Sequence, residues 1–230
     1  MRTASPSLAS IGTVLGSVLG ITLGLALVTG TAGAQTAPTR DDIVGKLNHL
    51  DTASDVDLAA LKQQTLERAR SRIKNDPGPV NRPLIAPDLV NLPAFSTPIQ
   101  FDDDTPIIQP ASYQTVGRIA DAMVQASLLP YTFLIVGHVE SNGKREANVI
   151  LSQRRADAIR DVLVNTFKIS AKRIQSIGLG EEQFLDRARP TAATNGQTQI
   201  LTFAKVPEDE PARSAAAPPS AATKKPARKH

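Results

Sequence analysis

Residues 131–167 contain a strand pattern followed directly by a helix pattern, and this pair constrains the fold more than any other stretch. The segment 131–137, YTFLIVG, is apolar enough to be a strand. Residues 146–167 then repeat apolar side chains at helical spacing. A strand and an amphipathic helix joined by a short loop bury their apolar sides against each other. The chain is therefore expected to build a sheet with helices packed on it.

The alternation continues on both sides of this pair. We predict strands at 97–101, 172–180 and 197–205, and a second helix at 111–128. The order strand, helix, strand, helix, strand, strand indicates an α/β fold, a two-layer sandwich with helices over one mixed sheet. The compact domain is expected to span residues 97–205.

The helix at 146–167 carries polar residues on the side that should face the sheet. At about 100° per residue, Arg155 lies about 20° from Asn148 in the middle of the inward side, with Ser152 close by. Apolar residues complete the inward side: Leu151, Ala158, Ile159, Val162 and Leu163. The outward side is expected to lie in water: Gln153, Arg154, Asp157, Arg160, Asp161 and Asn165. An inward guanidinium requires a partner, because an unpaired buried charge is strongly destabilising.

Glu140 is the acid that the topology brings nearest to Arg155. It follows the strand 131–137, and the loop 139–145 turns the chain back, so the end of the strand and the start of the helix lie at one end of the domain. Two interpretations are open. Glu140 and Arg155 either flank one binding pocket, or pair with each other as a structural salt bridge.

The segment 137–159, GHVESNGKREANVILSQRRADAI, carries a family resemblance. It is similar to the signature of the OmpA C-terminal-like, peptidoglycan-binding domain family, which runs G-H-T-D-x-x-G and then N-x-x-L-S-x-x-R-A. The matching positions are Gly137, His138, Gly143, Asn148, Leu151, Ser152, Arg155 and Ala156. With IQF at 99–101, RIQSIGLGEE at 173–182 and Asn195, the resemblance covers about residues 97–204.

The resemblance implies an OmpA-like fold and a non-catalytic module that tethers the envelope to the cell wall. In the family, the aspartate of the H-T-D run and the arginine of the S-x-x-R-A run hold the diaminopimelate of the peptidoglycan stem peptide. These positions fall on Glu140 and Arg155, and a fixed acid and guanidinium match the ammonium and carboxylate of diaminopimelate. Asn148, Asp104 and Thr105 complete the candidate peptidoglycan-binding residues. No cofactor is expected.

Three departures from the family pattern bear on affinity. Val139 stands where the family has threonine, and Glu140 adds a methylene to the usual aspartate. The segment NGQTQI at 195–200 lacks both arginines of the family's N-R-R-V run. The alternative function is therefore a degenerate OmpA-like domain, an envelope protein-interaction module that does not bind peptidoglycan.

The N-terminus predicts export. Residues 1–34 have an apolar core at 11–28 and an A-x-A pattern at Ala32–Ala34, as in a signal peptide cleaved before Gln35. The alternative is an uncleaved inner-membrane anchor, although the apolar core is barely long enough to span. We expect a periplasmic protein that is associated with the wall or the outer membrane of a Gram-negative cell.

The remaining segments are assigned by composition. Residues 35–74 are expected to be a helical N-terminal segment, with helices at about 39–50 and 54–74, and 75–96 a proline-rich linker. The helices either contact another envelope protein or pack on their own domain. Residues 206–230 are expected to be a disordered basic tail of alanine, proline and lysine.

Several classes of function and of partner are not expected. The chain has no cysteine and three histidines, and His138 with Glu140 alone cannot make a zinc site, so neither catalysis nor a metal is predicted. The net charge of +4 is weak, and the basic residues of the tail do not indicate a nucleic-acid partner in an exported protein. The segment between the signal peptide and the domain is too short for a transmembrane barrel.

Overall fold

The structure, a computed structural model, describes residues 38–71 and 78–206. The predicted signal peptide and the tail beyond residue 206 lie outside this range. In the two described stretches, no helix combines the length and the apolar character that crossing a membrane requires.

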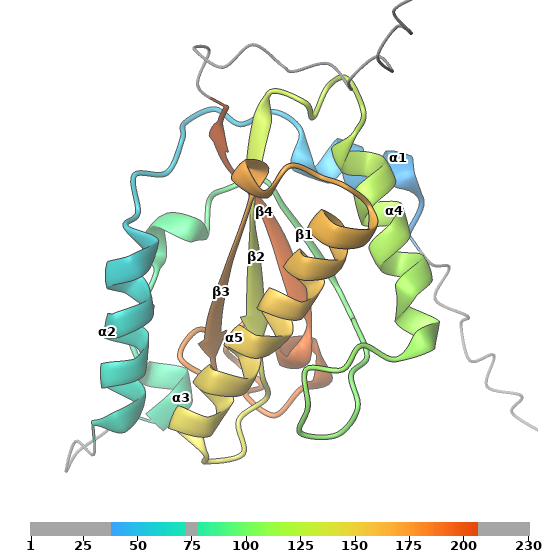
Figure 1. Cartoon of the computed structure of the whole chain (residues 1–230). Helices are drawn as coiled ribbons and strands as arrows, with labels where there is room; N and C mark the ends of the chain where they lie inside the picture. The colour runs from blue at the N-terminus through green and yellow to red at the C-terminus, as the bar shows by residue number, and fades with distance from the viewer. Residues whose placement is uncertain (1–37, 72–77, 207–230) are drawn as a thin grey trace, which may run out of the picture. The chain divides into compact units, whose positions relative to one another are not determined.

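A four-stranded mixed sheet forms the centre of the domain (Figure 1). Its strands are β1 (Ala94–Thr97), β2 (Tyr131–His138), β3 (Ile174–Gly180) and β4 (Thr198–Lys205). They lie in the order β1-β4-β2-β3. Strand β2 is parallel to β3 and antiparallel to β4, which pairs antiparallel with β1. Together with the two long helices of the domain, this arrangement confirms the predicted α/β class.

The helices follow the expected order, and their ends are set by local chemistry. Their bounds are α1 (Arg40–Leu47), α2 (Leu58–Arg70), α3 (Gly78–Asn81), α4 (Tyr113–Met123) and α5 (Arg145–Asp161). Helix α5 continues as a π-helical turn at Val162–Thr166. Thr39 and Asp42 form the capping box that the sequence suggests at the start of α1. Single 3-10 turns lie at Pro87–Leu89, Pro110–Ser112, Ala171–Arg173 and Ala193–Gly196.

Helices α1, α4 and α5 cover one face of the sheet. Strand β2 presents Phe133 and Ile135 to this side, because alternate residues of a strand point to the same face. They meet Ile119 of α4, Ile159 of α5 and Ile43 of α1, all of which are fully buried. The inward phase predicted for α5 is confirmed by Asn148, Ser152 and Ile159, which are buried.

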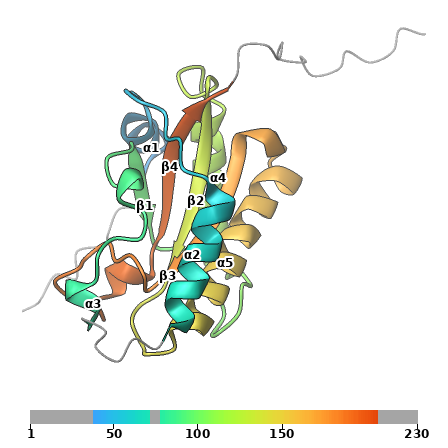
Figure 2. The ribbon, with the colours of Figure 1, turned by 90° about the vertical axis from the view of Figure 1, so that its left-hand side faces the viewer.

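The N-terminal arm is defined here as residues 38–71 and 78–92. Its helix α2 and its residues 85–92 cover part of the opposite face. Leu134 and Val136 of β2 point to this side and pack in a second cluster with Leu61, Ala86 and Leu89 of the arm. Helix α2 contacts both β3 and α5, and Figure 2 shows it lying alongside them. The arm thus packs on its own domain, and both faces of β2 are buried, which explains why its sequence is continuously apolar rather than alternating.

Two local predictions differ from the structure near the first strand. Strand β1 is Ala94–Thr97 instead of 97–101, and Phe101 makes only an isolated bridge with Ile108. Pro98 ends the strand because it has no N–H to donate to a ladder. Strand β1 therefore begins inside the stretch 75–96, which was expected to be a linker.

The prediction that the outward side of α5 is fully solvated is wrong for three residues. Gln153, Asp157 and Arg160 are half-buried and bond to β3: Gln153 Oε1 accepts from the Gly178 N–H (2.9 Å) and the Ser176 hydroxyl donates to Asp157 Oδ1 (2.6 Å). Arg160 Nε donates to the Ile174 carbonyl (2.9 Å). Because β3 is an edge strand, a second stripe of α5 contacts it in addition to the stripe that faces the core.

Candidate functional site

Three loops meet at the end of the domain where β2 and β3 finish (Figure 1). Residues 139–144 join β2 to α5, residues 98–109 join β1 to α4, and residues 181–197 join β3 to β4. Backbone bonds hold the first loop in place, from the Val139 N–H to the Gly180 carbonyl at the end of β3 (3.1 Å) and from the Ser141 N–H to the Pro190 carbonyl in the third loop (3.3 Å). All five predicted site residues lie on the first two of these loops or on α5.

Glycines allow α5 to lie against the sheet at this end. A Cβ on Gly137 of β2 would be 2.3 Å from the Ser152 carbonyl oxygen, and one on Gly178 of β3 would be 2.1 Å from the Gln153 nitrogen. Neither neighbour can yield, since both are helix backbone. The two glycines therefore fix the distance of α5 from the sheet and, with it, the position of Asn148 and Arg155.

Arg155 is half-buried and points toward the loop before α4. Its Nε donates to the Thr105 carbonyl (3.1 Å), and its guanidinium carbon lies 4.8 Å from the centroid of the Phe101 ring. Burial lowers the pKa of Arg155, and the negative charges of Asp104 and Asp103 act against this. An arginine stays protonated at neutral pH under such a shift.

The outer nitrogens of Arg155 are not used by the protein. Across residues 38–71 and 78–206, the hydrogen bond from Nε is the one direct bond of this guanidinium, so Nη1 and Nη2 make none. Arg154, the neighbouring arginine, is exposed as predicted. The phase assigned to these two arginines from the sequence is therefore confirmed. What remains is a fixed cation with two donor groups available for a planar anion such as a carboxylate.

Glu140 is an exposed residue of the loop 139–144. A Cβ on Gly196 would be 3.2 Å from its Oε1 atom, so the side chain rests against the segment that precedes β4. Among the residues that the structure describes, Glu140 and Arg155 form no ion pair. The interpretation of this pair as a structural salt bridge is therefore wrong.

Asp104 and Thr105 form a tight turn beside Arg155. Asp104 is exposed and has a left-handed backbone (φ 53°), and the Thr105 N–H bonds back to the Asp102 carbonyl (3.1 Å). The Thr105 hydroxyl donates to that carbonyl (3.1 Å) and accepts from the Ile107 N–H (3.1 Å). The hydroxyl thus shapes the turn, while the carbonyl of the same residue contacts Arg155.

Asn148 organises the loop rather than projecting from it. It is 3 % exposed, and its Nδ2 donates to Asn142 Oδ1 (2.8 Å) and to Glu181 Oε2 (2.8 Å). Both hydrogens of the amide are thereby used. Sequence reasoning missed Glu181, a buried acid directly after β3; its place behind the motif Gly178-Leu179-Gly180 is a signal that could have found it.

Two further residues hold the loops as structural groups. His138 is buried, its Nδ1 contacts the Gln183 carbonyl (2.9 Å), and burial lowers the pKa of His138 to about 4, so the ring is neutral at pH 7. Asn195 is fully buried and binds the loop 181–197 from within, accepting from the Asp186 N–H (2.7 Å) and donating to the Arg189 carbonyl (2.8 Å). Within the described ranges, no cluster of histidine and acidic side chains is suited to a metal ion.

The chain matches known proteins over this domain. Residues 100–197 match the OmpA family. An 85-residue stretch is 36% identical to outer membrane porin F of Pseudomonas aeruginosa, covering 37% of this chain and 24% of the porin. A 100-residue stretch is 33% identical to the peptidoglycan-associated lipoprotein of Brucella melitensis, covering 44% of this chain and 54% of the lipoprotein. The chain thus spans about a quarter of the porin and about half of the lipoprotein.

A solved structure gives a further match. The peptidoglycan-associated lipoprotein from Burkholderia pseudomallei aligns with 54% of this chain and 98% of its own, at 23% identity and a TM-score of 0.37. The family resemblance stated from the motif between Gly137 and Ile159 is confirmed by the family match and the curated relatives. Residues 100–197 of this chain accordingly form an OmpA-like domain.

Proposed function

We propose that this domain is a non-catalytic module that binds peptidoglycan through the diaminopimelate of the stem peptide and tethers the envelope to the wall. One observation carries the proposal: Arg155 is fixed by Thr105 and Phe101 while its outer nitrogens make no bond within the described residues. Curated relatives named peptidoglycan-associated lipoproteins, one of them 33% identical over 100 residues, support it.

The chemistry of the ligand matches the charges at this end of the domain. The distal centre of diaminopimelate carries one carboxylate and one ammonium group. Arg155 can take the carboxylate through two parallel hydrogen bonds. Acidic side chains on either side, Asp104 in one loop and Glu140 in the other, are available for the ammonium group. Asn148 then acts by holding the loop 139–144 in place for the ligand.

The cellular setting follows from this ligand. The protein would act in the periplasm, bound to the wall or associated with the outer membrane. The solvent-facing side of the N-terminal arm, which includes the exposed residues Lys62 and Glu67 of α2, is the part that would contact another envelope protein. In this arrangement the domain holds the wall and the arm faces the partner.

The test is co-sedimentation of the mature protein with insoluble wall of two kinds, at one fixed salt concentration. Wall that contains diaminopimelate should pellet the protein. Wall with lysine in its place lacks the distal carboxylate and should bind poorly, because Arg155 would lose water without gaining an acceptor. Equal binding to both walls would reject the diaminopimelate assignment, and binding to neither would reject wall binding altogether.

The alternative, a protein-interaction module that has lost the wall ligand, is favoured by one feature. Gly196 and Gln197 stand where the family motif has arginines, so these two positions contribute no cation. A mature protein that sediments with neither wall but co-purifies with an envelope protein through this domain would establish that alternative.

A further inference from the structure

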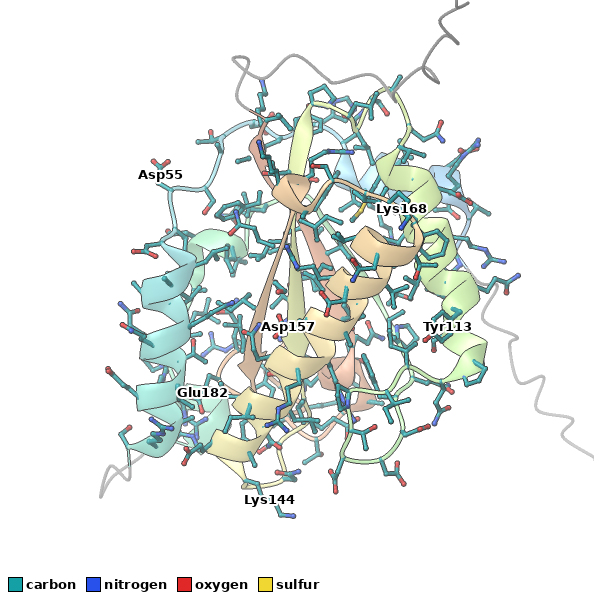
Figure 3. All side chains as sticks on the ribbon, viewed as in Figure 1. Asp55, Tyr113, Lys144, Asp157, Lys168 and Glu182 are labelled. Carbon is teal, nitrogen blue, oxygen red and sulfur yellow. The ribbon has the colours of Figure 1, made fainter. Side chains whose placement is uncertain are left out.

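Glu182, directly after β3, is a fully buried carboxylate surrounded by three arginines. Arg145, the first residue of α5, binds it with two bonds: Nε to Oε1 (2.7 Å) and Nη2 to Oε2 (2.8 Å). Arg68 of α2 places its Nε 3.4 Å from Oε2, and Arg82 places its Nη1 3.7 Å from the same oxygen. The Glu182 side chain is 0% exposed. Figure 3 shows Glu182 between α2 and the start of α5.

The arginines of this cluster come from parts of the chain that are far apart in sequence. Arg68 and Arg82 belong to the N-terminal arm, and Arg145 belongs to the OmpA-like domain. The arm is also bonded to Arg145 itself, since Arg145 Nη2 donates to the Arg68 carbonyl (3.0 Å). A third connection runs from the Ala86 N–H to Gln183 Oε1 (2.9 Å). The arm is therefore joined to residues 181–183 by charge and by a hydrogen bond, in addition to its apolar packing on the sheet.

Residues 181–183 are in turn bonded to the proposed wall-binding loop. Glu181 accepts from Asn148, which holds Asn142 in the middle of the loop 139–144. The Gln183 carbonyl contacts His138 at the start of that loop. Arg145, held by Glu182, is the residue at which the loop ends and α5 begins. Residues 181–183 are thus linked to the loop 139–144 at its start, its middle and its end. The same three residues are also bonded to the N-terminal arm.

We infer that Glu182 and Arg68 are positioning residues for wall binding, so that the N-terminal arm is itself part of the binding device, whatever its outer side contacts. This rests on the proposed function above. A buried carboxylate keeps its position only while cations surround it. Removing an arm arginine therefore loosens Glu182, then Arg145 and the loop end, although neither arm arginine needs to touch the wall.

The experiment compares two arginines on the same helix of the full mature chain. Arg68→Ala removes a cation from Glu182. Arg70→Ala is the matched control, because Arg70 pairs with Glu146 of α5 at the surface (2.8 Å, side chains 55% and 46% exposed). Leu61→Ala, which weakens the packing of α2 without touching Glu182, controls for a general loss of stability. Arg68→Lys restores the charge.

Two readouts are needed so that the inference and the proposed function can fail separately. Amide hydrogen exchange over residues 139–148 needs no ligand and should become about tenfold faster in Arg68→Ala, and stay near wild type in the Arg70, Leu61 and Arg68→Lys variants. Co-sedimentation with diaminopimelate wall should give a Kd about five- to tenfold higher for Arg68→Ala only.

The possible results distinguish the coupling of arm and loop, the positioning role and the proposed function. Unchanged exchange in Arg68→Ala, or an equal increase in Leu61→Ala, would overturn the coupling of arm and loop. Faster exchange with an unchanged Kd would overturn the positioning role. If the wild type binds no wall, the proposed function fails; hydrogen exchange then still decides whether the arm orders the loop.

Discussion

Two charged centres lie at the same end of the sheet, and they differ in how completely the protein satisfies them. In the closed centre, Glu182 is fully buried and surrounded by Arg68, Arg82 and Arg145. In the open centre, Arg155 is half-buried, and its outer nitrogens make no bond within the described residues. A buried charge that is paired within the protein stabilises the fold, whereas a fixed charge whose hydrogen-bond donors are unused can bind a ligand. The comparison predicts that substitutions in the closed centre lower the stability of the fold, and that substitutions in the open centre weaken ligand binding.

The largest effect is expected at the closed centre. Glu182→Ala leaves buried arginines without their shared anion and should lower the free energy of unfolding by about 3–5 kcal/mol. Glu146→Ala removes an exposed partner of Arg70 and should change it by less than about 0.5 kcal/mol. Urea unfolding of both variants measures the difference. Similar values at the two positions would show that the closed centre does not stabilise the fold.

Acid should reveal a second satisfied group, His138. Burial lowers the pKa of His138 from 6.5 to about 4. Between these two pH values the imidazole is protonated in the unfolded chain but stays neutral in the folded chain. Stability is therefore highest above pH 6.5 and falls between pH 6.5 and pH 4, by about 3 kcal/mol in total. Unfolding measured across this range tests the slope. His138→Gln, which cannot titrate, should flatten it; a slope that survives this change would assign it to other groups.

The open centre should respond in binding and much less in stability. Arg155→Ala should weaken co-sedimentation with diaminopimelate wall by more than about tenfold, since a charge-assisted bond contributes about 1.5–3 kcal/mol. Arg154→Ala, one residue earlier and exposed, should change neither binding nor stability beyond about 0.5 kcal/mol. Equal losses at both arginines would mean that the wall contact is a general attraction to positive charge.

The smallest effects are expected at Glu140, the exposed acid of the open centre. Glu140→Gln should weaken wall binding by about threefold, because an exposed charge pair contributes little, while Glu140→Asp should bind as well as wild type or better. Gly196→Ala adds a methyl group 3.2 Å from Glu140 Oε1 and should imitate Glu140→Gln by displacing the carboxylate. Combining Glu140→Gln with Arg155→Ala should be no worse than Arg155→Ala if both residues act on one ligand.

The parts of the molecule that repeat a local pattern could be predicted from the sequence. The helical period placed Arg155 inward and Arg154 outward, because both positions depend only on the rotation per residue. The order of strands and helices followed from alternating patterns in the same way. The family motif then marked Glu140 and Arg155 as functional, but whether they touch could not be known, since a loop of that length can place Glu140 on either side.

Long-range contacts could not be predicted, because no periodic pattern in the sequence indicates them. Arg68 and Arg82 have no sequence feature that pairs them with Glu182, which lies 114 and 100 residues further along the chain. The stretch with many prolines looked like a linker because Pro87 and Pro93 interrupt any helix, yet Ala86 and Leu89 are buried against the sheet. The stacking of Arg155 on Phe101 likewise depends on a turn whose shape is set by Asp104.

The way α5 meets β3 has a consequence for how this protein behaves at high concentration. An edge strand normally offers its outer N–H and C=O groups to another chain, which is a route to aggregation. Here helix side chains occupy three of these groups, with Gln153 on the Gly178 N–H, Ser152 on the Gly180 N–H and Arg160 on the Ile174 carbonyl. These three groups are therefore not free to pair with a second molecule, which disfavours association through the β3 edge of the sheet.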